Sequence, residues 1–90
     1  MAYRVELRNA ARKALGRLDP PVRAIAVAVI DGLSDAPRPP GCKAMSRDSE
    51  FRGCWRVEFG PRDGWRIVYR IDDRAQLVTL EAIGLRGDLY

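Results

Sequence analysis

The second half of the sequence holds three short segments that favour β-strands. In the segments 55–59 and 65–71 apolar and polar side chains alternate, and the segment 77–83 is rich in β-branched and large apolar residues. The short connections between them contain the turn-forming stretches 60–64 and 72–74. Strands joined by such short connections pair with their neighbours in the chain, so the sequence predicts an antiparallel meander.

The first third of the sequence combines one strand pattern with two helix patterns. Apolar residues alternate with charged ones over 3–8, which is typical of a half-buried strand. Over 10–18 and 22–33 they instead recur every three or four positions, which is typical of helices that bury one face. Asn9 is predicted to cap the first helix and Asp19 the second, which has proline in its first turn.

These elements form one domain, residues 1–90, because 90 residues cannot build a second core. The predicted fold is α+β, with two N-terminal helices packed on one face of a mainly antiparallel four-stranded sheet in the order βααβββ. Trp55 and Trp65 share the phase of the apolar strand residues and are assigned to the core. The opposite face of the sheet is expected to be open.

The second predicted helix is less polar on its outer side than a helix exposed to water should be. Ala24, Val27 and Ala28 lie on that side. Two explanations stay open: the two helices pack tightly together, or a partner covers this surface.

The composition excludes several kinds of chemistry. The chain has no histidine, which rules out a histidine-activated nucleophile, a histidine proton shuttle and a histidine-bearing zinc site. Cys42 and Cys54 are eleven residues apart with no other soft ligand nearby, and we interpret them as free thiols. We expect no metal ion and no cofactor.

The predicted open sheet face displays Arg56, Arg66 and Arg70, which could bind a polyanion or simply be solvated. The net charge is +4, and 14 of the 16 basic residues are arginine, whose planar guanidinium suits phosphate. A GC-rich genome explains this arginine count equally well. Charge alone therefore leaves RNA, DNA and an acidic protein open as partners.

No segment of the sequence is suited to crossing a membrane. The longest apolar run, 24–30, is far shorter than the ~20 residues that span a bilayer. The first eight residues have no uninterrupted apolar stretch and so do not look like an export signal. We expect a cytoplasmic protein that is not embedded in a membrane.

Two motifs near the end of the chain carry a resemblance to a known family. The strand 64–71 reads Gly-Trp-Arg-Ile-Val-Tyr-Arg-Ile, and the segment 83–90 reads Ile-Gly-Leu-Arg-Gly-Asp-Leu-Tyr. With the strand 53–59 and the order of elements, they resemble the RelE/ParE toxin superfamily over nearly the whole chain. Its RelE branch consists of ribosome-dependent mRNA endonucleases of toxin–antitoxin modules, and its ParE branch of gyrase inhibitors.

The resemblance implies roles for individual residues. Arg66 would stabilise the scissile phosphate, Arg86 would stabilise charge or protonate the leaving oxygen, and Tyr90 would orient the RNA. The stretch 37–53, rich in proline, glycine, serine and charge, is predicted to be a mobile loop or short helical turn. The candidate RNA-binding residues, most of them in this loop, are Lys43, Arg47, Arg52 and Arg70.

The chain departs from the family pattern at two positions. Arg56 occupies the first of two basic positions on its strand, but the second holds Glu58. Leu85 stands where many relatives have a basic residue or histidine. These departures bear on which group accepts the proton during cleavage.

Cleavage of RNA by its own 2′-hydroxyl needs a base, cations around the phosphate and an acid for the departing 5′-oxygen. Arginine is a poor base because its pKa exceeds 12. The candidate bases are Glu58, Tyr90, or the RNA and ribosome themselves. If the hairpin is centred on Arg62, Glu58 lies opposite Arg66. This pair is either a plain ion pair or a base held by an arginine.

We therefore expect the toxin of a type II toxin–antitoxin module that cleaves mRNA on the ribosome. A cognate antitoxin should silence it, and the two proteins could bind operator DNA as a hetero-oligomer through the antitoxin. Two alternatives stay open: a ParE-like inhibitor of DNA gyrase that acts by binding, and a catalytically inert homologue that acts only with its antitoxin.

Overall fold

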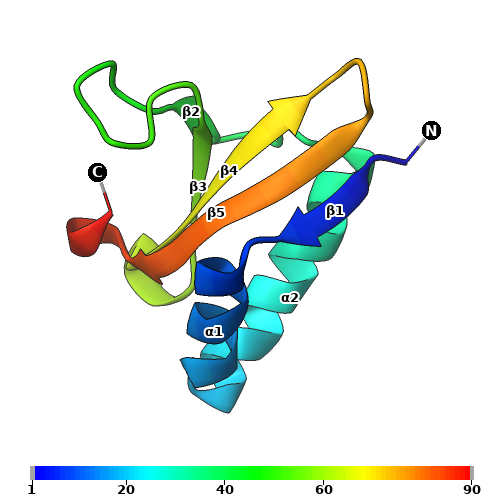
Figure 1. Cartoon of the computed structure of the whole chain (residues 1–90). Coiled ribbons are helices and arrows are strands. Elements are labelled where there is room, and N and C mark those ends of the chain that lie inside the picture. The colour runs from blue at the N-terminus through cyan, green and yellow to red at the C-terminus, as the bar shows by residue number, and fades with distance from the viewer. Residues whose placement is uncertain (1, 90) are drawn as a thin grey trace.

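All predicted helices and strands are present in the computed structural model, which describes residues 2–89 (Figure 1). The elements in chain order are β1 (Arg4–Leu7), α1 (Asn9–Arg17), α2 (Pro20–Asp35), β2 (Lys43–Ala44), β3 (Trp55–Phe59), η1 (Pro61–Asp63), β4 (Trp65–Asp72), β5 (Leu77–Leu85) and η2 (Arg86–Asp88). η1 and η2 are single 3-10 turns. Both helices pack on one face of the sheet, so the predicted α+β class is confirmed.

The sheet has five strands rather than the four predicted, in the order β1-β5-β4-β3-β2. β1 is parallel to β5, and all other neighbouring strands are antiparallel. The additional strand is β2, in which Lys43 pairs with Arg56 of β3. Two residues are too few to show a periodic pattern, which is why the sequence predicts only a loop in this stretch.

The β3–β4 hairpin has the predicted register. Glu58 lies opposite Arg66, and Phe59 lies opposite Trp65. The turn begins at Gly60, whose φ of 81° is in the left-handed region. A Cβ at this position would lie only 2.9 Å from Cδ1 of Trp65, so glycine is required there. The turn sequence thus determines which strand residues face one another.

The main core lies between the helices and the sheet. Leu33 of α2 is completely buried there, as are Tyr69 and Leu80 of the sheet. Burial of each such side chain contributes about 1.5–3 kcal/mol. Trp55 and Trp65 pack against this core but are only half-buried, so their assignment to it is correct in part.

The sheet face opposite the helices is partly covered, although the sequence predicts an open face. Met45, Cys54 and Val68 are buried there, and Phe51 and Leu89 pack against them. The loop between β2 and β3 and the C-terminal segment are thereby attached to the sheet by a small apolar cluster. Apart from Val68 of β4, these residues come from irregular segments, where no hydrophobic period exists to reveal them.

The two predicted helix caps differ in detail from the structure. α1 begins at Asn9, so Arg8 and not Asn9 is the N-cap. The N–H of Arg8 donates to the carbonyl of Leu80 at 3.0 Å, and this bond to β5 holds Arg8 in an extended conformation. Asp19 is the N-cap of α2 as predicted, but its side chain makes no capping hydrogen bond.

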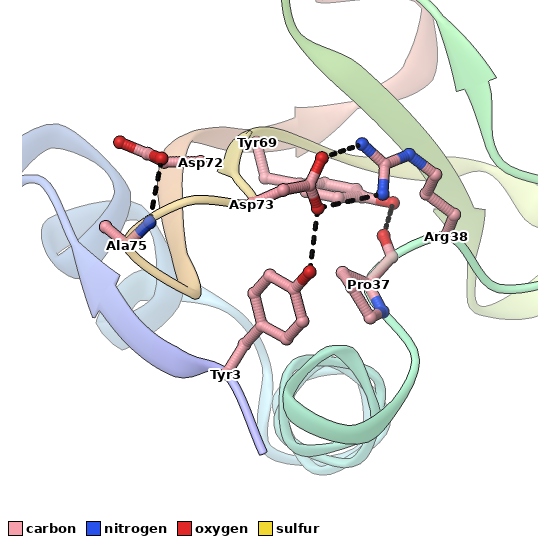
Figure 2. Close-up of polar contacts among 7 residues, drawn as sticks. All are labelled: Tyr3, Pro37, Arg38, Tyr69, Asp72, Asp73 and Ala75. Carbon is pink, nitrogen blue, oxygen red and sulfur yellow. Dashed lines mark hydrogen bonds and ion pairs between the residues drawn. The ribbon is translucent and has the colours of Figure 1, made fainter. Parts of the chain in front are cut away.

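A polar network joins the start of β1, the segment after α2 and the β4–β5 turn (Figure 2). The guanidinium of Arg38 donates to both carboxylate oxygens of Asp73 at 3.2 and 2.9 Å, and the Tyr3 hydroxyl donates to Oδ1 at 2.7 Å. These bonds, from Arg38 first and then Tyr3, lower the pKa of Asp73. Cζ of Arg38 also lies 5.1 Å from the ring centroid of Trp55, which is a cation–π contact. The network holds the segment that leads into β2 against the sheet.

The outer side of α2 exposes apolar side chains. Ile25 and Val27 are 40% and 43% exposed, and Ala24 and Ala28 are exposed as well. Packing between the helices therefore does not cover this surface. No helix in the described part of the chain has the length and apolar character needed to cross a membrane.

Candidate functional site

Arginines of the two central strands meet around one carboxylate on the sheet face opposite the helices. Oε1 of Glu58 lies 3.8 Å from Nε of Arg56, and its Oε2 lies 3.5 Å from Nε of Arg66. The hairpin register places Glu58 opposite Arg66, while Arg56 precedes Glu58 by two residues on the same strand. We call Arg56, Glu58 and Arg66 the central triad.

The polar atoms of the central triad are incompletely satisfied. Nε of Arg56, Nε of Arg66 and Oε2 of Glu58 are buried without a hydrogen-bond partner within residues 2–89. The two distances between an arginine Nε and a Glu58 carboxylate oxygen are within the range of an ion pair but too long for a good hydrogen bond. Buried polar groups normally have a partner. These atoms therefore keep unused hydrogen-bonding capacity, with N–H groups of the kind that suits an anion and a carboxylate oxygen of the kind that suits a hydroxyl.

Arg66 is only 8% exposed, far less than expected for an arginine on an open sheet face. Its Nη1 donates a hydrogen bond to the backbone carbonyl of Leu89. Leu89 lies over Gly84, the β5 neighbour of Arg66, where a Cβ would be 3.6 Å from Cδ1 of Leu89. The prediction of an exposed Arg66 is wrong, because the C-terminal segment docks through tertiary contacts that no local pattern records.

A pocket of about 440 Å³ borders Glu58 at the turn end of the hairpin. Its lining residues are Pro40, Gly41, Lys43, Val57, Glu58, Asp63 and Arg86. Two cations, Lys43 and Arg86, thus meet two carboxylates, Glu58 and Asp63, in one cavity. The structure brings together three residues predicted from the sequence, Lys43, Glu58 and Arg86, and adds Asp63.

A second carboxylate on this face is Glu81 of β5, which the sequence pattern does not reveal. Its Oε1 accepts a hydrogen bond from Nη1 of Arg8 at 3.0 Å, and its Oε2 lies 3.9 Å from Nε of Arg70. The β4–β5 register shifts between Val68 and Tyr69, and Glu81 is the β5 residue left without a partner. A bulge of this kind is not visible in the sequence. The predicted RNA-binding residue Arg70 is thus paired with an acid.

The remaining predicted residues lie elsewhere. Arg47 and Arg52 are exposed in the loop between β2 and β3 and do not line the pocket. Leu85 is 49% exposed, at the end of β5. Tyr90 lies outside the described residues.

The two cysteines are free, with Cys54 buried and Cys42 partly buried. Burial raises the pKa of the Cys54 thiol, which is therefore mostly protonated at neutral pH and a poor nucleophile. Among residues 2–89, no group of three or more potential metal ligands lies together. The charged groups that gather on this face are arginines, lysine and carboxylates.

Comparison with known proteins gives a consistent result. The sequence model for the ParE toxin of type II toxin–antitoxin systems, parDE, matches residues 5–90. The RelBE2 toxin–antitoxin complex from Mycobacterium tuberculosis has 29% identity and a TM-score of 0.79, over 96% of this chain and 100% of the other. No curated protein sequence matches the chain.

Two further solved structures share the fold at lower identity. The archaeal RelE–RelB complex from Pyrococcus horikoshii has 21% identity and a TM-score of 0.75, over 97% of this chain and 98% of the other. The isolated RelE toxin from E. coli has 22% identity and a TM-score of 0.75, over 93% of this chain and 84% of the other.

Proposed function

This chain belongs to the ParE toxin family of type II toxin–antitoxin systems, within the RelE/ParE superfamily, and from that premise we propose that it is a ribosome-dependent mRNA endonuclease. The observation that carries the proposal is the central triad, in which a carboxylate lies between two arginines whose buried Nε–H groups have no hydrogen-bond partner within residues 2–89. The reaction is attack of the 2′-hydroxyl on the adjacent phosphate. It belongs in the cytoplasm, where translated mRNA is found.

In this reaction Glu58 accepts the proton of the 2′-hydroxyl, and the 2′-oxygen forms a bond to phosphorus. Arg56 and Arg66 stabilise the negative charge that the phosphate gains. The bond from phosphorus to the 5′-oxygen then breaks, this oxygen takes up a proton from solvent water, and Glu58 returns its proton to the solvent. Arg86, in the pocket beside Glu58, stabilises the charge on the leaving oxygen.

Substrate binding requires the C-terminal segment to move. The Arg66 N–H that donates to the carbonyl of Leu89 has to be released before it can donate to a phosphate oxygen. Tyr90 directly follows Leu89 in the sequence. We propose that Tyr90 stacks on an RNA base once the segment has moved, since such stacking contributes ~1–3 kcal/mol.

A cognate antitoxin is the partner that the comparisons support, since relatives of this chain are solved as toxin–antitoxin complexes. The apolar outer side of α2 is the surface that such a partner would cover, because Ile25 and Val27 are exposed there. The resulting hetero-oligomer would contact operator DNA through the antitoxin.

The direct test is to map mRNA 5′ ends after adding the purified protein to programmed ribosomes and to naked mRNA. We expect cleavage of the ribosome-bound message only. Arg66→Ala should lower the rate at least ~100-fold, as loss of a transition-state charge contact does. Arg66→Lys, which keeps the charge in the buried site but loses the guanidinium fork, should also be slow. Arg74→Ala on the exposed β4–β5 turn is the control and should retain the wild-type rate.

Inhibition of DNA gyrase is the second candidate function, and the match to the ParE model favours it. The burial of Arg66 under Leu89 also fits a protein that does not use this arginine in chemistry. A supercoiling assay with purified gyrase distinguishes the two functions. Gyrase inhibition without mRNA cleavage would replace the nuclease proposal, and neither activity would indicate an inert homologue.

A further inference from the structure

The outer surface of α1 holds cations without acidic partners. Arg12, Lys13 and Arg17 are exposed, and none of them forms an ion pair within residues 2–89. We call these three residues the α1 cation cluster. The segment 7–18 contains four of the 16 basic residues of the chain and none of its 12 acidic ones. Its charge of +4 equals the net charge of the whole chain. The rest of the sequence therefore has as many basic residues as acidic ones.

Six arginines elsewhere form ion pairs, which they make with four carboxylates. The pairs are Arg4–Glu6, Arg8–Glu81, Arg38–Asp73, Arg56–Glu58, Arg66–Glu58 and Arg70–Glu81. The central triad therefore carries a net charge of only +1, although an RNA substrate is strongly negative. A further surface with unpaired cations, such as the α1 cation cluster, would strengthen the electrostatic attraction of RNA to this protein.

The α1 cation cluster faces away from the proposed cleavage site. α1 packs on the helix-covered face of the sheet through Ala11, whereas the central triad is on the opposite face. A single strand that occupies the site cannot also lie on the outer surface of α1. Arg8 lies between β1 and α1, and its side chain bonds to Glu81 on the sheet face that carries the central triad. Arg8 therefore marks the edge of the sheet where this face meets the helix-covered face. Figure 1 shows α1 beside the half of β5 that leads to the C-terminal segment.

The surface between these cations suits phosphates better than a protein partner. Asn9, Ala10 and Gly16 are the other exposed positions of α1, and none has a large apolar side chain. Protein interfaces need an apolar core. Phosphate backbones instead need separated cations on an accessible surface, and two of the three cations here are arginine.

We propose that the α1 cation cluster binds the phosphate backbone of a folded RNA, separate from the strand that is cleaved. This inference rests on the proposed function, in which ribosomal RNA surrounds the bound message. The enzyme would thus contact RNA with two opposite faces, one for docking and one for cleavage. Arg23 at the start of α2 donates to the carbonyl of Gly16 at 3.5 Å and lies beside the cluster, whereas the remaining outer side of α2 is apolar and carries Asp31 and Asp35.

The test measures binding to purified programmed ribosomes by co-sedimentation at several salt concentrations. Arg12→Gln/Arg17→Gln should weaken binding about tenfold or more and reduce the slope of log K against log salt by roughly 1.5, since each lost phosphate contact removes about 0.7–0.9. Arg4→Gln/Arg74→Gln is the matched control with the same loss of charge, at the β4–β5 turn end of the sheet. It should bind like the wild type.

The outcomes separate this inference from the proposed function. An unchanged slope for Arg12→Gln/Arg17→Gln, or equal losses in both double variants, would overturn the docking surface. The same variant is also titrated with duplex DNA. If Arg12→Gln/Arg17→Gln binds DNA more weakly than the wild type but binds ribosomes equally well, the partner of the cluster is DNA and not folded RNA. If wild-type protein binds ribosomes through α1 but leaves mRNA intact, the docking surface stands and only the nuclease proposal fails. If cleavage occurs, the α1 variant should show a raised KM for ribosomes and an unchanged kcat.

Discussion

Nη1 of Arg66 donates a hydrogen bond to the backbone carbonyl of Leu89, so the C-terminal segment occupies the guanidinium proposed to hold the scissile phosphate. Breaking a hydrogen bond to a charged group costs ~1.5–3 kcal/mol. In this structure the Nη1 N–H group of Arg66 is therefore not available to a substrate. The packing of Leu89 should control how readily Arg66 is released.

Leu89→Ala should loosen the C-terminal segment and uncover Arg66. The Leu89 side chain packs against the apolar cluster around Val68, and truncating a half-buried leucine should lower the free energy of unfolding by about 1–2 kcal/mol. Urea denaturation measures this loss. Phenylglyoxal modification of Arg66, followed by peptide mass spectrometry, should be faster in the variant.

Leu85→Ala provides the control for this experiment. Leu85 is 49% exposed, so its truncation should change neither the stability nor the modification rate. Equal reactivity of Arg66 in the wild type and in Leu89→Ala would show that Leu89 does not cover the guanidinium.

Glu58→Gln should slow ribosome-dependent cleavage at least ~100-fold, because an amide cannot accept the proton of the 2′-hydroxyl. Glu81→Gln is a close match, since Glu81 also lies between two arginines on the same sheet face but does not line the pocket. It should retain activity within a few-fold. Single-turnover rates of both variants decide the question.

Glu58→Lys tests the opposite role for this residue. If Glu58 only neutralises Arg66, this change restores the basic pair of the family and should raise the cleavage rate. Full activity of Glu58→Gln together with a faster Glu58→Lys would leave Tyr90, the RNA or the ribosome as the group that accepts the proton.

The elements of the fold that follow from local patterns could be predicted from the sequence. The β3–β4 register follows from the alternation of the strands and from the turn that begins at Gly60, and it correctly places Glu58 opposite Arg66. β2 could not be predicted, because two residues show no period. Glu81 could not be placed either, since the bulge depends on how β5 fits against β4.

The candidate site was predictable in its residue types but not in its accessibility. Strand alternation correctly places Arg56, Glu58 and Arg66 on one face. The burial of Arg66 depends on Leu89, which is 23 residues away in sequence and belongs to an irregular segment. Contacts of this kind arise from chain packing in three dimensions, and neither propensity nor periodicity records them.

Asp73→Asn should destabilise the protein in a pH-dependent way. Hydrogen bonds from Arg38 and Tyr3 lower the pKa of Asp73 in the folded state, so its carboxylate contributes stability above the unfolded pKa of about 4. This contribution is lost as the pH falls through the lower, folded pKa. The difference in unfolding free energy between wild type and Asp73→Asn should therefore be constant from about pH 5 to 8 and shrink below about pH 4.

Urea denaturation across this pH range measures the Asp73 contribution, with Asp31→Asn on the exposed side of α2 as the control. A difference that does not shrink in acid would mean that the network of Tyr3, Arg38 and Asp73 adds no charge-dependent stability.

Ile25→Ser/Val27→Ser should weaken the complex with the cognate antitoxin while leaving the isolated toxin stable. Both side chains are exposed on α2, so their loss should change the free energy of unfolding by less than about 0.5 kcal/mol. In a complex they would become buried, and the loss of two apolar contacts should reduce affinity at least about tenfold, measured by calorimetric titration. Leu85→Ser removes an equally exposed apolar side chain at the end of β5 and should leave affinity unchanged. Weaker binding by Leu85→Ser, with full binding by Ile25→Ser/Val27→Ser, would place the antitoxin on the cleavage-site end of the sheet instead of on α2.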